Sequence, residues 1–161
     1  MSVSDPVPAE LLANDLVLVL RGAIENNSHL FSPNEHQGVE EIVSLPSNSQ
    51  RLLARLLERK GPAIRLDSVP YEDVGSPEEA LAQLLQSGLA VELGHGWTRT
   101  QCFSMPELKA LLRESGRPVS GKKADLVERV MDAGLSPVGR VIVLLVGDLV
   151  RRCEWLFFGV P

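Results

Sequence analysis

The sequence predicts a mainly α-helical chain that includes a small α/β body and ends in a short strand and helix. Several segments repeat apolar residues every three or four positions, with serine or proline at their start and glycine or proline at their end. Only a few short runs alternate apolar and polar residues in the manner of strands. With 161 residues, 44% of them apolar, the chain is large enough to build a hydrophobic core in one or two domains.

Two helices are expected near the N-terminus, after a start at residues 1–8 that reads as disordered. Apolar residues at helical spacing predict a helix over residues 10–28, although its β-branched valines lower the helix propensity. Residues 32–35, Ser-Pro-Asn-Glu, form a capping box with proline at the first helical position. They predict a second helix that runs to about Ser44.

A third helix is predicted from residues 47–49 to the Gly-Pro pair at 61–62. It carries leucines on one face, and arginines recur every four residues on the other. We therefore predict a basic stripe opposite the leucines, formed by Arg51, Arg55, Arg59 and Lys60. From the residues alone, a solvated helix face and a contact to phosphate groups both remain open.

Short strands and one more helix follow the basic stripe. Residues 63–66 read as a strand, and the Ser-Pro-Glu-Glu run at 76–79 is a capping box for a helix that Gly88 ends. Residues 89–93 alternate as a second strand, and residues 94–97 are typical of a tight turn into a partner strand. Helices followed by such a hairpin indicate a winged-helix-like body.

The last helix of a winged-helix body is usually the one that reads DNA. Here residues 77–86 hold two glutamates and no basic residue, so we do not expect this helix to enter a groove. If the body contacts DNA, it does so through the basic stripe, as a phosphate contact rather than as base readout.

The segment 103–134 predicts two short helices joined by a basic, extended turn, in the run FSMPELKALLRESGRPVSGKKADLVERVMDAG. Ser104 and Glu107 form a capping box for a helix that starts at Met105. Gly116 can end this helix because glycine tolerates a positive φ. The inward face of the second helix is predicted to carry Leu126, Val127, Val130 and Met131.

The start of the second helix suggests an anion site. Pro118 keeps the preceding residue extended, and Ser120 is predicted to cap the helix. Backbone N–H groups without helical partners follow this cap, and Gly121 lets an anion approach them. Lysines at a helix N-terminus oppose the helix dipole, so Lys122 and Lys123 indicate an anionic partner. A solvated basic end on a helical hairpin is the alternative interpretation.

The two helices and their turn resemble the SAP module, a DNA-binding domain, in the run PELKALLRESGRPVSGKKADLVERV. In that family the turn and the N-terminus of the second helix lie against duplex DNA. The resemblance therefore implies that five residues contact phosphate groups, namely Arg117, Ser120, Gly121, Lys122 and Lys123.

The resemblance widens to the N-terminal region of the Fanconi-associated nuclease family over about residues 16–159. It rests on the SAP-like run, on RKGPAIRLD at 59–67 and on DLVRRCEWLFFG at 148–159. In that family this region is the DNA-binding front end of a repair nuclease that acts on branched or 5′-flapped duplexes. The resemblance adds three candidate DNA contacts, Arg55, Arg59 and Lys60.

The family continues into a VRR-NUC domain that holds Mg or Mn for phosphodiester hydrolysis, and the sequence has no matching motif. Its one Glu-x-Lys spacing, at 58–60, lies on the predicted basic helix without an acidic partner. The histidines and cysteines lack the close pairs that zinc sites use. We therefore expect no catalytic residue, metal or cofactor in this chain, and we interpret it as a truncated or free-standing member.

Net charge is −5 but is uneven along the chain. Residues 1–50 hold one arginine against seven carboxylates, whereas residues 104–131 hold six basic residues against four acidic ones, so overall acidity does not exclude DNA.

Cys102 and Cys153 are too few for a disulfide framework, and the sequence indicates neither a signal peptide nor a membrane span. We expect an intracellular protein, in the cytoplasm or nucleoid if bacterial and in the nucleus if eukaryotic.

We predict four regions: N-terminal helices (9–45), a winged-helix-like body (46–101), a SAP-like module (102–135) and the start of a following helical region (136–161). Two functions remain open. The first is the DNA-binding front end of a structure-selective, metal-dependent repair nuclease, with catalysis outside this chain. The second is a non-catalytic module in which the SAP-like helices and the aromatic C-terminal helix bind a partner protein. Binding that weakens steeply with salt would favour the first.

Overall fold

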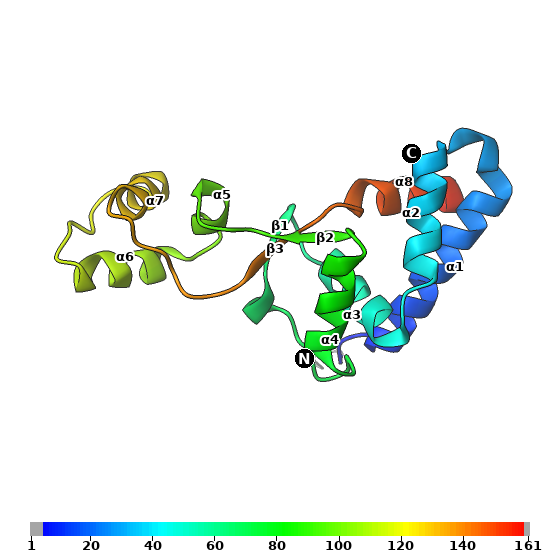
Figure 1. Ribbon diagram of the computed structural model, residues 1–161, viewed down its shortest axis with the longest axis horizontal. Helices are drawn as coiled ribbons and strands as arrows, with labels where there is room; N and C mark the ends of the chain where they lie inside the picture. The colour runs from blue at the N-terminus through cyan, green and yellow to red at the C-terminus, as the bar shows by residue number, and fades with distance from the viewer. Residues whose placement is uncertain (1–4, 160–161) are drawn as a thin grey trace. The chain divides into compact units, whose positions relative to one another are not determined.

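The computed structural model describes residues 5–159, so residues 1–4 of the predicted disordered start lie outside the described residues. The helices (Figure 1) are α1 (Ala9–Asn27), α2 (Pro33–Val43), α3 (Ser47–Leu57), α4 (Pro77–Gln86), α5 (Trp97–Thr100), α6 (Met105–Glu114), α7 (Lys123–Asp132) and α8 (Gly147–Phe158). The strands are β1 (Ala63–Arg65), β2 (Ala90–Glu92) and β3 (Val141–Leu144). The fold is therefore mainly α-helical with a small sheet, which confirms the predicted fold class.

The described residues divide into two compact units. Unit 1 comprises residues 5–62, 69–91 and 144–159, and unit 2 comprises residues 63–68 and 92–143. Each unit is thus built from segments that are far apart in the sequence. The boundaries of the four regions proposed above remain a prediction.

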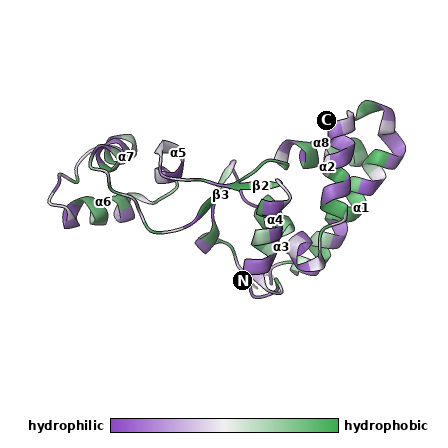
Figure 2. Ribbon diagram, in the orientation of Figure 1, coloured by the Kyte–Doolittle hydropathy of each residue, from purple (hydrophilic) through white to green (hydrophobic). Residues whose placement is uncertain are grey.

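Unit 1 is a helical body in which α1 packs against α8 and α3, and α3 packs against α4. Leu20 of α1 and Leu53 and Leu56 of α3 are fully buried. Figure 2 shows hydrophobic and hydrophilic residues sharing these helices, as expected when one face of each helix covers a core. This packing explains why the valine-rich segment in α1 is helical, because tertiary burial outweighs the small propensity penalty of β-branched residues.

Two serines were expected to cap helices of unit 1, and only one does. The Glu35 N–H donates to Ser32 Oγ at 3.2 Å and the Ser32 N–H donates to Glu35 Oε2 at 2.7 Å, which confirms the capping box of α2. The box predicted at Ser76 is wrong, because Ser76 has a left-handed backbone with φ of 50° and its side chain accepts no helix N–H. α4 nevertheless begins at Pro77, whose fixed φ and missing N–H suit the first helical position.

Unit 2 has its own core around α6 and α7. Both helices end as expected, with Gly116 and Gly134 following them at φ of 72° and 68°. The capping box of α6 is confirmed, since the Ser104 N–H donates to Glu107 Oε2 at 2.7 Å and the Glu107 N–H donates to Ser104 Oγ at 3.4 Å. The buried cluster consists of Phe103, Leu108, Leu112, Leu126, Val127, Val130 and Val141.

The three strands form one sheet in the order β1-β3-β2, and β1 pairs with β3 in antiparallel register, Ile64 opposite Ile142. The prediction that residues 94–97 turn into a partner strand for β2 is wrong. The chain instead forms α5, in which buried Thr100 donates from Oγ1 to the Gly96 carbonyl at 2.8 Å. The neighbour of β2 in the sheet is instead β3, which follows the SAP-like module and in which Val141 and Ile142 are buried.

Neither the two cysteines nor the apolar helices of the described residues indicate a further function. Cys102 and Cys153 are free thiols. Burial raises the pKa of the Cys102 thiol and raises that of Cys153 to about 11, so neither is an activated thiolate. Within residues 5–159, every helix is too short or too polar to cross a bilayer.

Candidate nucleic-acid interface

The extended turn between α6 and α7, residues 115–122, belongs to unit 2, and most of its residues are exposed. After Gly116, the Arg117 N–H donates to the Leu112 carbonyl at 2.9 Å, which closes the end of α6. Val119 packs partly against the unit 2 core, whereas the other residues of the turn are exposed. One partly buried apolar side chain therefore anchors a turn whose other residues are exposed.

Arg129 of α7 fixes the shape of this turn. Its Nη1 donates to the Pro118 carbonyl at 2.9 Å and to the Ser120 carbonyl at 2.8 Å. The sequence interpretation did not include Arg129. Its position seven residues after Lys122, which places both on one helix face, is the signal that would have found it.

The prediction that Ser120 caps α7 is wrong. The helix begins at Lys123, with Lys122 as the N-cap residue, and the Lys122 N–H donates to Asp125 Oδ2 at 2.9 Å. Asp125 thus fixes the helix start two residues later than predicted, because an acidic side chain in the first turn satisfies the N-cap N–H and complements the helix dipole. Ser120 contributes its carbonyl, which accepts from Arg129.

Gly121 is required where the turn meets α7. Its φ is 119°, which disfavours any residue with a Cβ. A Cβ at this position would also lie 2.9 Å from Asp125 Oδ2. Glycine therefore allows the chain to pass beside the Asp125 carboxylate.

Three of the predicted contact residues are exposed cations, Arg117 and Lys122 in the turn and Lys123 at the start of α7. The N-terminus of α7 adds its partial positive charge, and the N–H groups of Lys123 and Ala124 precede the first helical hydrogen bonds. Asp125 is the nearby carboxylate, and it accepts the Lys122 N–H. The arrangement of cationic side chains around a helix N-terminus is suited to a phosphate group.

The basic stripe predicted on α3 is not a solvent-facing stripe. The Arg55 side chain is only 5% exposed, and its Nη2 donates to Asp73 Oδ2 at 2.6 Å. Asp73 Oδ2 also accepts the first N–H of α1, from Ala9, at 2.6 Å. Asp73 therefore draws Arg55 inward, and the prediction that Arg55 lies on an outer face is wrong.

The other members of the stripe are also placed differently from expectation. α3 ends at Leu57, so Arg59 and Lys60 lie beyond the helix, where both are exposed. Arg51 remains on α3, half-buried, with Nη2 at 4.0 Å from Glu10 Oε1. Only Arg59 and Lys60 of the stripe retain the exposure that a phosphate contact requires.

The last helix of the predicted winged-helix-like body, α4, presents acidic residues. Glu78 and Glu79 lie exposed in its first turn, where they complement the helix dipole, and α4 carries no basic residue. The expectation that α4 does not enter a groove of DNA rests on these same acidic residues and stays a prediction.

Ligands for a metal ion do not come together in the structure. Among residues 5–159, no three side chains of His, Cys, Asp or Glu are grouped so that they could hold an ion. Glu58, from the Glu-x-Lys spacing, accepts from Arg55 Nη1 at 3.2 Å.

Arg65 and Glu107 connect β1 to the start of α6 within unit 2. Arg65 Nη1 donates to Glu107 Oε2 at 2.6 Å, and the Arg65 guanidinium lies 4.3 Å from the centroid of the Phe103 ring. The hydrogen bond from Arg65 and that from the Ser104 N–H lower the pKa of Glu107 from 4.5 to about 2. The ionised Glu107 is thus part of what holds α6 in place.

Replacing Glu107 with glutamine should make the stability of unit 2 less dependent on pH. Because the folded-state pKa of Glu107 is depressed, its stabilisation is present above pH 4.5 and is lost as pH falls toward 2. Urea unfolding at several pH values across this range should show a shallower loss of stability for Glu107→Gln than for the wild type. Glu114→Gln, at the exposed end of α6, is the control and should leave the pH profile unchanged; an unchanged profile for Glu107→Gln would contradict this role.

Comparison with known proteins agrees with these features. Residues 12–91 match the family described as FAN1, HTH domain, and residues 103–133 match the SAP domain. The chain is 33% identical over 104 residues to the Fanconi-associated nuclease 1 homolog of Oryza sativa subsp. japonica, covering 60% of this chain and 11% of the relative. It is 37% identical over 71 residues to the Fanconi-associated nuclease 1 homolog of Arabidopsis thaliana, and the match covers 44% of this chain and 8% of the relative. It is 25% identical to Fanconi-associated nuclease 1 of Ailuropoda melanoleuca, and this match covers 95% of this chain and 17% of the relative.

Solved structures share the fold. The crystal structure of paFAN1 bound to 2nt 5′-flap DNA with gap aligns with a TM-score of 0.76 at 23% identity, covering 96% of this chain and 31% of that chain. The crystal structure of paFAN1 bound to 1nt 5′-flap DNA with gap aligns with a TM-score of 0.74 at 22% identity, covering 93% of this chain and 30% of that chain. The chain is therefore a helix-turn-helix domain combined with a SAP domain. It belongs to the Fanconi-associated nuclease family, in which it corresponds to the N-terminal region, and it spans 8 to 17% of the length of the curated relatives above.

Proposed function

We propose that the chain is the DNA-binding region of a Fanconi-associated nuclease and holds duplex phosphates with the turn between α6 and α7. The observation that carries this proposal is the pair of exposed lysines at the N-terminus of α7, Lys122 and Lys123, with Arg117 exposed earlier in the same turn, whose carbonyls at Pro118 and Ser120 accept hydrogen bonds from Arg129. Gly121 and the Ser120 carbonyl complete the turn. These groups recognise phosphate charge and not base edges, so binding has little sequence preference.

The distribution of charge supports this assignment. Residues 63–68 and 92–143, which form unit 2, hold nine basic side chains against seven carboxylates. The rest of the chain holds seven basic side chains against fourteen carboxylates. An electrostatic field of this kind attracts a polyanion to unit 2 and disfavours it at the acidic helices of unit 1.

Unit 1 contributes at most a minor phosphate contact in this proposal. Arg59 and Lys60, at the end of α3, are exposed and keep their role as candidate contacts. Arg55 does not, because its guanidinium is buried against Asp73.

The substrate of the whole protein is a 5′-flapped or branched duplex in this proposal, since the paFAN1 neighbours are named as complexes with 5′-flap DNA. Metal-dependent hydrolysis with Mg or Mn belongs to another part of the protein. The curated relatives named above come from eukaryotes, which supports a nuclear location.

Fluorescence anisotropy with two duplexes of unrelated sequence tests the proposal. The logarithm of the binding constant should fall linearly with the logarithm of salt concentration, and similarly for both duplexes. Replacing Lys122 and Lys123 with alanine should make this slope shallower by up to about 1.8, because each lost phosphate contact removes about 0.9. The control is Arg21→Ala with Arg151→Ala, which removes two exposed charges from unit 1 and should leave the slope nearly unchanged.

The same measurement separates this function from a protein-binding module. If binding is insensitive to salt, or if both double variants change the slope equally, the phosphate contact at α7 is wrong. The interaction-module function would then be favoured, because an apolar interface depends little on salt.

A further inference from the structure

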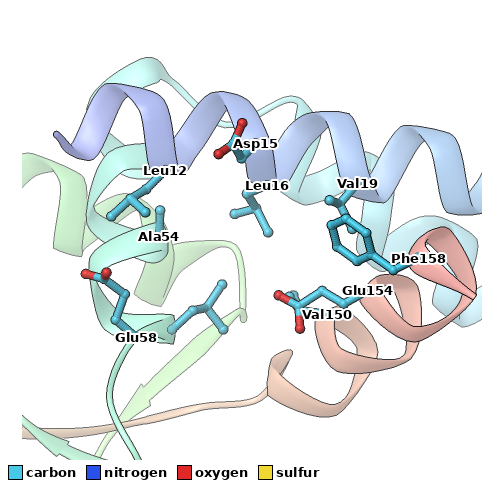
Figure 3. Close-up of a pocket in the computed structure, with 10 residues that line it drawn as sticks. Leu12, Asp15, Leu16, Val19, Ala54, Glu58, Val150, Glu154 and Phe158 are labelled. Carbon is cyan, nitrogen blue, oxygen red and sulfur yellow. The ribbon is translucent and has the colours of Figure 1, made fainter. Parts of the chain in front are cut away.

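A groove in unit 1 has no part in the proposed contact with DNA. It lies between α1, α3 and α8 (Figure 3) and has a volume of about 370 Å³. Its walls are mainly apolar side chains, including Leu16 and Val19 of α1 and Phe158 of α8. Phe158 is 62% exposed although it lies beside this apolar wall, whereas Leu16 and Val19 are mostly buried, so Phe158 is the apolar side chain of the groove that remains most open to solvent.

Three carboxylates join the apolar lining of the groove, namely Asp15 of α1, Glu58 directly after α3 and Glu154 of α8. Figure 3 shows the carboxylate of Glu154 pointing into the groove. Glu58 accepts from Arg55 at 3.2 Å. No side chain in the described part of the chain forms an ion pair with Asp15 or Glu154. An occupant that covers these two carboxylates must supply positive charge, because burying an unpaired carboxylate is strongly unfavourable.

We propose that this groove binds an amphipathic helix of a partner protein, with a stripe of apolar residues flanked by lysines or arginines. The apolar stripe would contact Leu16, Val19 and Phe158, and the flanking cations would pair with Asp15 and Glu154. A helix laid in a groove is a common mode of peptide recognition, in which apolar residues at i, i+3 and i+4 fill the floor.

The negative charge of the groove also disfavours a nucleic acid or a second copy of the chain as its occupant. A nucleic acid would place phosphates against three carboxylates, which disfavours it. A second copy of unit 1 would bring the same excess of carboxylates, fourteen against seven basic residues in the sequence outside unit 2. A cationic helix is attracted by this field and fits both the apolar wall and its acidic rim.

A fluorescein-labelled peptide of about 18 residues, built from leucines and lysines with the leucines on one helical face, is a direct probe. Anisotropy should show saturable binding of this peptide and no binding of the peptide in which glutamates replace all lysines. Phe158→Ala and Glu154→Lys should each weaken binding by about tenfold or more. Both positions are exposed, so both variants should fold, which circular dichroism checks.

Matched controls are Trp97→Ala, an exposed aromatic residue of unit 2, and Glu40→Lys, an exposed carboxylate on α2. Both should bind the lysine peptide as the wild type does. Equal binding of the glutamate peptide, or equal weakening by the control variants, would overturn the proposal. So would self-association of the chain that Phe158→Ala abolishes, since the groove would then belong to a second copy.

Discussion

Replacing Asp73 with alanine should destabilise unit 1 by about 3 kcal/mol, the lower end of the range for breaking a buried ion pair, because Asp73 itself is partly solvated. The change leaves the buried guanidinium of Arg55 with Glu58 as its carboxylate partner at 3.2 Å. It also removes the acceptor of the Ala9 N–H at the start of α1. Urea unfolding at neutral pH, followed by the fluorescence of Trp155 in α8 in a Trp97→Phe background, measures the loss.

Two further variants separate the ion pair from a general effect of substitution. Glu72→Ala, at the exposed neighbouring position, should change stability by less than about 0.5 kcal/mol. Arg55→Met combined with Asp73→Ala should recover part of the stability, because the double variant no longer buries a guanidinium that has lost one of its two carboxylate partners. The contribution of Asp73 depends on pH, since the hydrogen bond from Arg55 lowers the pKa of Asp73, and it should vanish as pH falls through that lowered pKa. Equal stabilities for Asp73→Ala and Glu72→Ala would contradict this account.

Leu126→Ala should destabilise unit 2 by about 2 to 4 kcal/mol, because Leu126 of α7 is fully buried in the cluster with Leu108 and Leu112 of α6. A small two-helix core has few other side chains that can move into the space. Unfolding of the whole chain, followed by Trp97 in a Trp155→Phe background, reports on unit 2. The control is Glu128→Ala, two residues further along α7 and exposed. If both variants unfold at the same urea concentration, Leu126 is not part of the core that the structure places it in.

Helix starts that depend on neighbouring residues could be predicted from the sequence. The boxes at Ser32 and Ser104 need only a glutamate three residues later, and both formed as expected. Ser76 has the same local pattern, yet its left-handed backbone prevents the cap. Ser120 does not cap α7, because the Asp125 side chain in the first turn accepts the Lys122 N–H and Lys122 becomes the N-cap residue. Serine therefore marks the region of a helix start but does not by itself fix the residue.

Features set by distant residues could not be read from the sequence. Arg55 faces inward because it pairs with Asp73, which lies in the loop before α4. The helical periodicity of α3 gives no information about the position of that loop. The neighbour of β2 is likewise a strand that follows the whole SAP domain. In the candidate interface, Arg117 and Lys122 are exposed as a basic turn requires, whereas Arg129 was missed because it acts through backbone carbonyls rather than through a recognisable motif.

The most direct test of the proposed DNA contact is a titration of the ¹⁵N-labelled chain with a short DNA duplex, followed by amide chemical shifts. Phosphate contact at the turn predicts the largest shift changes at residues 117–125, which include the N–H groups of Lys123 and Ala124 at the start of α7. Residues of α4, with its exposed Glu78 and Glu79, should change little. Large changes in α4 with an unperturbed turn would contradict the account, because DNA would then bind the acidic helix-turn-helix domain and not the SAP domain.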